Sequence, residues 1–456
     1  MAIMRPGFQI SRLKEPDELI EKLKEQGLEA PVSSDLDGLR RPVEIYGKTL
    51  PNSTLIQPME GADSDTDGSP TKITERRYGK FARQGAAVIW FEATAVTEDG
   101  RDCANQLWIR PENVDKFKAL VDEVDRISQE ANGFKPYKIL QLTHSGRCAE
   151  TSDGKPHPKT AFANPYLDTT MGKAEVVSDE FYENLKKAIA EGARLAKEAG
   201  FDAVDLKLCH QYIMKEMLCA YTRPGRYGGS IENRFRFAFE TIDAIKEAVG
   251  DAVDIVVRLS AYDSVPYPYG WGMKQTPGVM EDDQAEVDIL LDELSKRGVE
   301  LVNITTNEPR FAPEDLGYLS NFLDNEYIDQ FRGVSHLLKV TRELKKKHSE
   351  LKLVATGLAY FAQFAPYVGS GGIEQGWFDL AGFGRNIMAD DSFLPNAIKN
   401  DFVDQRSLCM RCDSCYRMFD RKIPTGCMVR DPFYQMVDTM DKKERTDDKG
   451  KNSPIM

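Results

Sequence analysis

Long apolar stretches are missing from this chain of 456 residues. The longest uninterrupted apolar run covers six residues, 86–91, whereas a membrane-spanning helix needs about 20. The first sixteen residues contain no apolar segment of the kind that marks a secretory signal. We therefore expect a cytoplasmic protein with no membrane partner.

An excess of positive charge is also missing. The chain has 60 Lys and Arg against 73 Asp and Glu, which gives a net charge of −13. Such a chain is a poor candidate for binding nucleic acid through the phosphate backbone. Hydrophobic residues make up 41% and charged residues 29%, and this composition excludes wholesale disorder.

Eight short apolar segments recur along the chain, and amphipathic helical patterns follow several of them. This alternation indicates an α/β fold, and eight repeats predict a closed (β/α)8 TIM barrel. A doubly wound open sheet is the alternative, disfavoured because no G-x-G-x-x-G follows the first segment. The expected strands span residues 53–57, 86–94, 137–144, 203–209, 254–260, 301–306, 351–357 and 378–384, and the clearest helical patterns span 186–200, 234–249, 284–297 and 334–347.

Three regions follow from this pattern. Residues 1–40 are expected to form an N-terminal extension with a helix, residues 41–405 the barrel, and residues 406–456 a cysteine-rich segment with a charged tail that frays from residue 441. Two long connections, 261–281 and 307–329, are expected to cover a pocket, because loops of this length in compact folds are usually functional.

Polar side chains collect where the expected strands end. Within 203–209, Val204, Leu206 and Leu208 form an apolar face, so Asp205 and Lys207 should point into the barrel. An internal Asp205–Lys207 ion pair is the alternative account of those two residues. Active sites of such barrels lie at the carboxyl ends of the strands, so this distribution indicates catalysis. The residues concerned are Glu60, Glu92, Gln141, His144, Lys207, His210, Arg258 and Asn303.

Small residues follow the last two expected strands, at Gly357 and at Gly382 and Gly384, and Arg385 comes next. Glycines let backbone N–H groups approach an anion, and Arg385 adds a guanidinium donor. Barrels commonly bind a phosphate at this place, so we expect an anion site here.

Four of the eight cysteines lie within nineteen residues, in the pattern C-x2-C-x2-C-x11-C formed by Cys409, Cys412, Cys415 and Cys427. This spacing favours a [4Fe–4S] cluster. Structural zinc usually divides its ligands into two separated pairs, and it stays the alternative, as a zinc-stabilised barrel without redox chemistry. The scattered cysteines are expected to pack in the core or in loops.

Several motifs together resemble the old yellow enzyme-like NADH:flavin oxidoreductase family. The segment KLCHQYIMKEMLCAYTRPGRYGGSIENRFRF is the most specific, and QPMEG, LQLTHSGR, VVRLS and FGR also fit. The resemblance covers about residues 42–400. It implies that FMN binds non-covalently. The backbone of Pro58 and Met59 would contact the flavin, Gln141 would bind its pyrimidine edge, and Arg258 would lie near N1/O2. Gly357, Gly384 and Arg385 would bind the phosphate, and Glu60 and Glu92 would also lie at the cofactor.

The chain departs from the family at two places. Glu60 stands where the family usually has Thr or Cys, and the substrate pair, usually two His or His and Asn, is here Lys207 and His210. The resemblance implies that this pair holds a carbonyl oxygen, that Tyr212 is the proton donor, and that hydride passes from reduced flavin N5 to the activated C=C bond of an unsaturated carbonyl compound.

The position of the cysteines resembles that in relatives of the amine dehydrogenase and dienoyl-CoA and enoate reductase type, where a cluster carries electrons. We expect electrons to arrive from NAD(P)H or from a separate electron-transfer protein. Alternatives are an amine-type dehydrogenase that passes electrons outward and a non-catalytic flavin/iron–sulfur carrier. The sequence leaves a homo-oligomer possible and does not specify the substrate.

Overall fold

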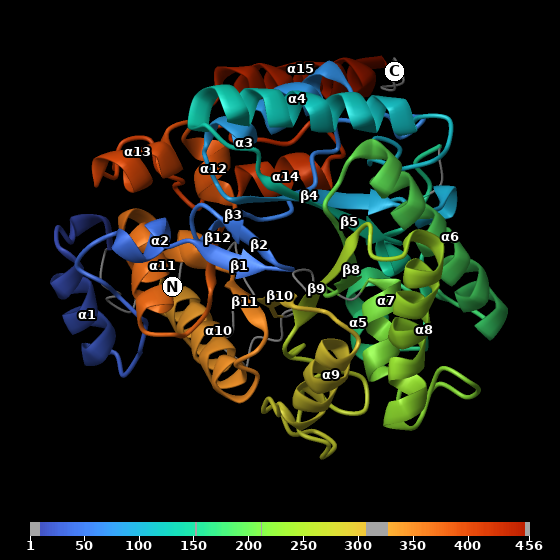
Figure 1. The fold of residues 1–456 in the computed structure, drawn as a ribbon. Coiled ribbons are helices and arrows are strands. Elements are labelled where there is room, and N and C mark those ends of the chain that lie inside the picture. The colour runs from blue at the N-terminus through green and yellow to red at the C-terminus, as the bar shows by residue number, and fades with distance from the viewer. Residues whose placement is uncertain (1–9, 151–152, 211, 307–326, 452–456) are drawn as a thin grey trace.

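Eight parallel strands close into a barrel, which confirms the predicted fold (Figure 1). The computed structural model describes residues 10–150, 153–210, 212–306 and 327–451. Each strand falls within or at the edge of a predicted apolar segment, and β12 pairs with β3 to close the cylinder. The strands are β3 (Thr54–Ile56), β4 (Val88–Ala95), β5 (Tyr137–Thr143), β8 (Ala203–Leu208), β9 (Asp254–Ser260), β10 (Leu301–Thr305), β11 (Lys352–Ala355) and β12 (Leu380–Phe383).

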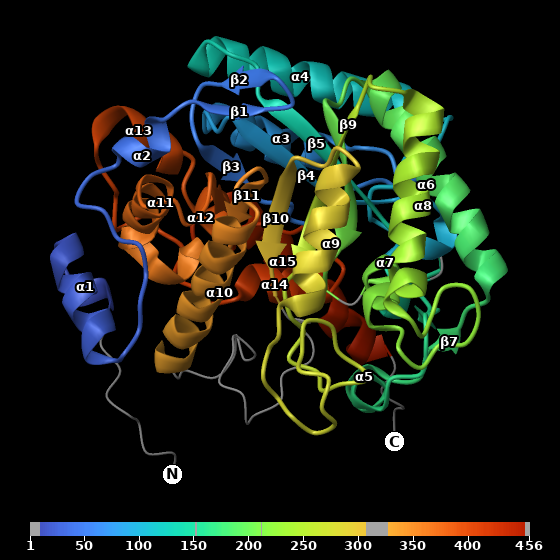
Figure 2. The ribbon, with the colours of Figure 1, turned by 60° about the horizontal axis from the view of Figure 1, so that its bottom comes forward.

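Helices surround the strands (Figures 1 and 2), and the four clearest helical patterns correspond to α6, α8, α9 and α10. The boundaries of α6 have local causes: the Ser178 hydroxyl accepts from Phe181 N at the start, and Gly200 adopts a left-handed conformation at the end. The surrounding helices are α3 (Lys72–Arg83), α4 (Val114–Asn132), α6 (Asp179–Ala199), α8 (Ile231–Val249), α9 (Ala285–Lys296), α10 (Tyr327–Lys347), α11 (Ala365–Glu374) and α12 (Arg385–Ala389).

The core has two layers. Val204, Leu206 and Leu208 of β8 belong to the large cluster between the strands and the helices, as their alternation predicts. A second cluster fills the barrel interior, where Trp90 of β4 lies, and it includes side chains of the hairpin β1 (Val43–Ile45) and β2 (Lys48–Leu50). Because apolar side chains fill this part of the interior, the polar groups gather at the carboxyl ends of the strands.

The N-terminal extension packs against the barrel helices. The predicted helix is α1 (Pro16–Glu25), whose Leu19 and Leu23 are buried in the large cluster. The following short helix, α2 (Asp37–Arg40), lies beside α11 in Figures 1 and 2. Contact is close at Gly38, where a Cβ atom would stand 2.4 Å from the Ser370 carbonyl oxygen. The extension therefore shares its core with the barrel.

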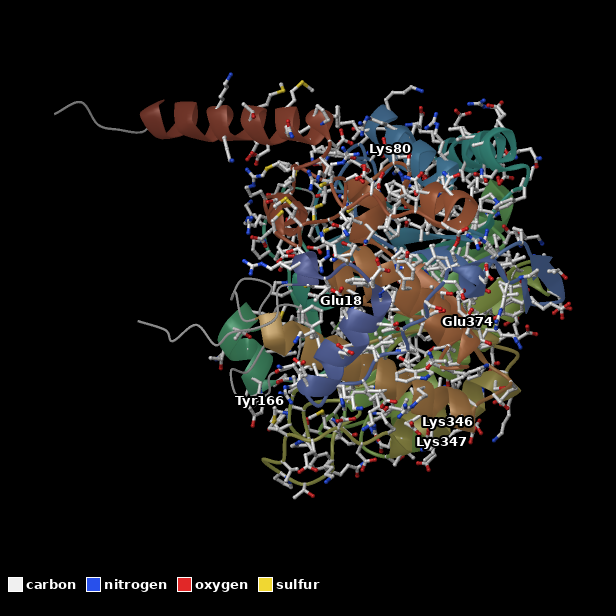
Figure 3. All side chains as sticks on the ribbon, turned by 90° about the vertical axis from the view of Figure 1, so that its left-hand side faces the viewer. Glu18, Lys80, Tyr166, Lys346, Lys347 and Glu374 are labelled. Carbon is white, nitrogen blue, oxygen red and sulfur yellow. The ribbon has the colours of Figure 1, made fainter. Side chains whose placement is uncertain are left out.

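The C-terminal region forms α13 (Phe393–Asn400), α14 (Ser414–Asp420) and α15 (Pro432–Lys451). The prediction that the chain frays from residue 441 is wrong, because α15 continues to Lys451 and projects beyond the body of the molecule (Figure 3). Asp431 anchors the start of this helix through ion pairs with Arg76 and Lys80 of α3. Asp438 and Lys442 add an i,i+4 pair along it.

Smaller elements complete the loops: α5 (Pro165–Met171), α7 (Ile213–Glu216), β6 (Lys159–Thr160) and β7 (Glu175–Val176). The predicted long connection 261–281 is present, whereas most of 307–329 falls outside the described residues. No helix in the described part of the chain is both long and apolar enough to cross a bilayer.

Candidate functional site

A cavity of about 280 Å³ opens at the carboxyl ends of the barrel strands. Its wall combines residues that follow β3, β8, β10, β11 and β12 with residues of α10, α12 and the cysteine-rich segment. The lining residues are Gln57, Pro58, Met59, His210, Arg258, Thr305, Thr306, Leu337, Thr356, Gly357, Leu358, Ala359, Tyr360, Gly382, Gly384, Arg385, Asp413 and Tyr416.

The structure brings eight of the predicted barrel residues to this wall: Pro58, Met59, His210, Arg258, Gly357, Gly382, Gly384 and Arg385. Five others are not among the lining residues: Glu60, Lys207 and Tyr212, which contact one another, Glu92, which accepts from Gly61 N, and Gln141, which donates to Asp205.

Arg258 presents a guanidinium to the cavity from β9. Its Nε atom is buried and has no hydrogen-bond partner among the described residues. Asp205 lies beneath it and accepts from the Arg258 backbone N–H at 2.7 Å. The other Asp205 oxygen accepts from Gln141 Nε2 at 2.5 Å and from Trp90 Nε1 at 2.8 Å. Burial raises the pKa of Asp205 to about 6. The unpartnered donor indicates a place for an electron-rich group of a bound molecule.

Glycines contribute another part of the cavity wall. Gly357 is left-handed, with φ of 83°. A Cβ atom at Gly382 would stand 1.9 Å from Gln57 Nε2, so only glycine leaves room for that amide. Together with Arg385, which follows Gly384, these turns form a cradle that fits an anionic group.

Glu60 joins Lys207 and Tyr212 through one oxygen. Its Oε1 accepts from Lys207 Nζ at 2.9 Å and from the Tyr212 hydroxyl at 3.1 Å. Lys207 Nζ also lies 3.3 Å from the centre of the Tyr212 ring. Glu60 Oε2 is buried and lacks a hydrogen-bond partner within the described chain. The suggested Asp205–Lys207 ion pair is therefore wrong, since Lys207 pairs with Glu60 and Asp205 binds the neighbouring strands.

His210 follows β8 and is the member of the predicted substrate pair that reaches the cavity. Its backbone is left-handed, with φ of 59°, which is rare for a residue other than glycine. Its Nε2 lies 3.4 Å from Thr305 Oγ1. Such a strained conformation is found mostly at functional sites.

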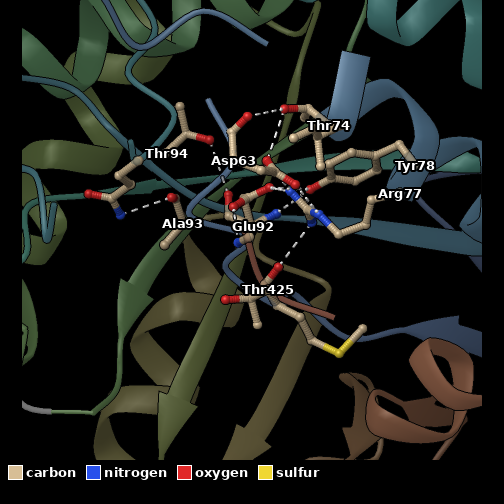
Figure 4. A network of polar contacts seen from close by, with 12 residues as sticks. Asp63, Thr74, Arg77, Tyr78, Glu92, Ala93, Thr94 and Thr425 are labelled. Carbon is tan, nitrogen blue, oxygen red and sulfur yellow. Dashed lines mark hydrogen bonds and ion pairs between the residues drawn. The ribbon is translucent and has the colours of Figure 1, made fainter. Parts of the chain in front are cut away.

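A buried network holds the loop that carries Pro58 and Met59 (Figure 4). Arg77 of α3 donates to both Asp63 oxygens, at 2.7 and 2.9 Å, and pairs with Glu92 of β4. Arg77 also donates to the Met59 carbonyl at 3.2 Å, and Glu92 Oε2 accepts from the Gly61 backbone at 2.6 Å. Burial raises the pKa of Glu92. Glu92 thus positions this loop from behind the cavity wall.

The four clustered cysteines line a second, small cavity. Among the described residues, the only group of three or more His, Cys, Asp or Glu ligand atoms within 4.8 Å of one another is Asp292, His348 and Glu350. No three of the four sulfurs therefore lie within 4.8 Å of one another. Burial raises the pKa of Cys415 to about 11, so metal binding there would release a proton.

The two cavities share a wall. Arg385 and Asp413 line both of them and form an ion pair with each other. The Arg385 guanidinium also lies 5.2 Å from the centre of the Tyr360 ring, which lines the larger cavity. The cysteine-rich segment is also joined to the loop after β3, because Thr425 N donates to the Gly61 carbonyl at 2.8 Å.

The sequence matches the model of the NADH:flavin oxidoreductase / NADH oxidase family over residues 39–308. The chain belongs to this family. It is a flavin-dependent oxidoreductase, as the resemblance of its motifs implied. The match begins before β1 and ends just after β10.

Curated relatives of this flavin oxidoreductase include NADPH dehydrogenases. That of Geobacillus sp. (strain WCH70) is 34% identical over 246 residues, which make up 51% of this chain and 68% of the relative. That of Bacillus licheniformis is 29% identical over 291 residues, or 62% of this chain and 78% of the relative.

Solved structures show the same fold. A 2-naphthoyl-CoA reductase in complex with 2-naphthoyl-CoA gives a TM-score of 0.70 at 18% identity, over 86% of this chain and 57% of that one. Histamine dehydrogenase from Rhizobium sp. 4-9 gives a TM-score of 0.63 at 22% identity, over 86% of this chain and 52% of that one. Morphinone reductase in complex with tetrahydroNAD gives a TM-score of 0.58 at 21% identity, over 80% of this chain and 92% of that one. This flavin oxidoreductase thus spans little more than half the length of two of these neighbours.

Several wall residues escaped sequence reasoning. Thr305 and Thr306 are the last two residues of the predicted strand 301–306, and the strand-end argument could have included them. Arg77 and Asp63 could not be found in this way, because their importance depends on the meeting of α3 with the loop after β3. Asp413 and Tyr416 lie among the cysteines, and no pattern indicated that they reach the larger cavity.

We expect Arg77→Met to destabilise the protein by about 3–5 kcal/mol, because it leaves Asp63 and Glu92 buried without their cation. FMN binding should weaken as well, since the Met59 carbonyl loses a donor. Urea unfolding and flavin fluorescence titration measure the two effects. Lys72→Met removes the same charge from an exposed position of α3 and should change neither quantity. Equal stability of both variants would contradict the role of the network.

Asp205 should make stability depend on pH. Its pKa in the folded protein lies above the unfolded value, so its contribution is complete below about pH 4 and is lost as the pH rises through about 6. We expect Asp205→Asn to remove this part of the fall in the free energy of unfolding between pH 4 and 6. Urea unfolding of both proteins at several pH values measures the difference. Parallel profiles of variant and wild type would refute the assignment.

Proposed function

We propose that the larger cavity binds FMN and reduces the activated C=C bond of a small unsaturated carbonyl compound. The observation that carries this proposal is the buried, unpartnered Arg258 Nε in a cavity that also has glycine turns in its wall, within a family whose members use flavin. Pro58 and Met59 would contact the flavin through backbone, Arg258 would meet its N1/O2 edge, and Gly357, Gly384 and Arg385 would hold its phosphate. Gln141 would act through Asp205.

The bound flavin supplies hydride chemistry, and the protein supplies binding and proton transfer. His210 reaches the cavity wall and would donate to the carbonyl oxygen of the substrate. Tyr212 would protonate the carbon next to that carbonyl. Lys207 lies over the Tyr212 ring, so its positive charge would stabilise the phenolate left by that proton transfer. Glu60 fixes the positions of both groups by accepting from each.

A second candidate is oxidation of an amine, with electrons leaving the protein. One observation favours it: Glu60 Oε2 is a buried carboxylate oxygen without a partner among the described residues, and it could accept from an N–H group of a substrate. A substrate screen under anaerobic conditions separates the two directions, because an enone oxidises the reduced protein whereas an amine reduces the oxidised one. Turnover with neither class would indicate a pure electron carrier.

We also propose that residues 406–456 form a cluster segment, with Cys409, Cys412, Cys415 and Cys427 as ligands of a [4Fe–4S] cluster. The spacing of the cysteines in the sequence and the single small cavity that all four of them line both support it. The shared wall of Arg385 and Asp413 would place the cluster beside the flavin site. NADPH is the proposed direct hydride donor, since the NADPH dehydrogenase relatives are named for it.

Tyr212→Phe should slow oxidation of the reduced protein by an enone about 100-fold, the lower range for loss of a general acid. Lys207→Met should slow it too, because the phenolate loses its neighbouring cation. Stopped-flow absorbance of the flavin measures the rate, and the spectrum reports whether FMN stays bound. Tyr166→Phe, on α5, makes the same change at a half-exposed position and should be silent. Unchanged rates in both site variants would overturn the assigned roles.

Cys412→Ser and Cys427→Ser should each lower the iron and acid-labile sulfide content and abolish the paramagnetic signal of the reduced cluster. Cys148→Ser, outside the cluster segment, should retain all three. Protein purified without oxygen and analysed by metal content and EPR provides the measurement. One zinc per chain, with no iron and no signal in the wild type, would contradict the cluster and favour the zinc alternative.

A further inference from the structure

We propose that the exposed face of the cluster segment is a docking site for a small acidic electron-carrier protein. The face consists of Met410, Cys412, Arg406, Arg417 and Arg430, and is called the cluster face below. The inference rests on the proposed cluster, and it adds the place where electrons enter or leave and the charge of the partner.

Charge is the first observation. Residues 406–456 contain eleven Lys and Arg against eight Asp and Glu, so this segment carries +3, whereas the rest of the chain carries −16. A [4Fe–4S]²⁺ cluster with four thiolates has a charge of −2, which leaves the loaded segment close to neutral or slightly positive. An acidic partner would be repelled by the rest of the surface and accepted here, and such complementarity guides protein association.

Three arginines of the segment keep their guanidinium groups at the surface. Arg417 and Arg430 are exposed and form no ion pair with a carboxylate of the described residues, and Arg406 pairs with Asp404 although its side chain is 90% exposed. Other cations of the segment point into the body instead. Arg421 pairs with Asp438 and Asp441, and Lys422 pairs with Asp102 and Glu150.

The exposed arginines contact the cysteine loop itself. Arg417 Nη2 donates to the Cys412 carbonyl at 2.8 Å, and Arg430 Nε donates to the Leu408 carbonyl at 3.4 Å, next to Cys409. Positive charge therefore surrounds the cluster position directly. The acidic groups nearest in sequence are Asp404, which pairs with Arg406, Asp413, which pairs with Arg385, Asp431, which pairs with Arg76 and Lys80, and the exposed Asp420.

The cluster face also has the exposure that electron transfer needs. Cys412 is the exposed member of the four cysteines, and the adjacent Met410 side chain is 60% exposed and apolar. On the opposite side, Arg385 and Asp413 separate the cysteine cavity from the flavin cavity. Electrons would thus pass between the flavin site and the surface through the cluster, with Cys412 as the outer ligand.

An exposed apolar residue in a segment with three exposed arginines fits a small carrier with an acidic rim and a redox centre near its surface. The transfer balances as one electron per encounter: the reduced carrier is oxidised by one electron, and the cluster is reduced by one. Two encounters supply the electron pair that hydride transfer consumes, and the accompanying proton comes from solvent.

The test uses the complete protein with its cofactors under anaerobic conditions and a small acidic two-cluster ferredoxin as the probe. We expect Arg406→Glu/Arg430→Glu to lower the second-order rate of cluster reduction by reduced ferredoxin at least tenfold at low salt, and high salt to narrow this difference. Lys187→Glu/Lys197→Glu, on exposed positions of α6, makes the same charge change on another face and should leave the rate within twofold.

Further readouts separate the outcomes. Reduction by dithionite, reduction by NADPH and the cluster EPR signal should be equal in both double variants and the wild type, so loss of ferredoxin reactivity alone supports docking. Arg417→Gln is measured with the same readouts, because it removes a positive charge without introducing a negative one. An unchanged ferredoxin rate in Arg406→Glu/Arg430→Glu, or equal reactivity with a basic c-type cytochrome, overturns the proposal. Absence of iron in the wild type overturns the proposed cluster and this inference together.

Discussion

One buried cation, Arg77, determines where the cavity wall stands. It neutralises Asp63 and Glu92 in a region that water does not reach, and it holds the loop after β3 by the Met59 carbonyl while Glu92 holds the same loop by the Gly61 amide. Two buried carboxylates without this guanidinium would be costly, so the three residues constrain one another. The loop that supplies Pro58, Met59 and Glu60 to the site is therefore rigid because of charges on α3 and β4, which do not themselves line the cavity.

The same loop connects the two proposed redox sites. Its Gly61 carbonyl accepts from Thr425 of the cluster segment, and its Glu60 orders Lys207 and Tyr212. Glu60 and Lys207 compensate each other, so the substrate end of the cavity carries little net charge. This balance suits a neutral carbonyl compound better than a free carboxylate, which would compete with Glu60 for Lys207. The departure of this chain from its family at Glu60 and Lys207 is thus one joint change, since each residue is the partner of the other.

The barrel could be predicted from the sequence because alternating apolar segments are a local pattern that needs no knowledge of distant contacts. All eight predicted strands are present. Residues placed by strand ends were also accessible: His210, Arg258, Gly357 and Arg385 reach the cavity wall. Contacts between distant segments were not. The pairing of Lys207 with Glu60 joins residues 147 positions apart, and the helix that replaces the expected frayed tail depends on Asp431 meeting α3. Periodicity specifies which way a side chain points, but not which partner it meets there.

The wall shared by Arg385 and Asp413 has a consequence for how the holoprotein is made. These two side chains line both cavities, so whichever of the two proposed prosthetic groups bound first would fix part of the surface that receives the second. The order in which the two groups bind would then matter in the cell. Chains that mature during iron shortage would lack the cluster side of this wall when the nucleotide binds. If both proposed groups bind, flavin content would follow iron supply through these two side chains.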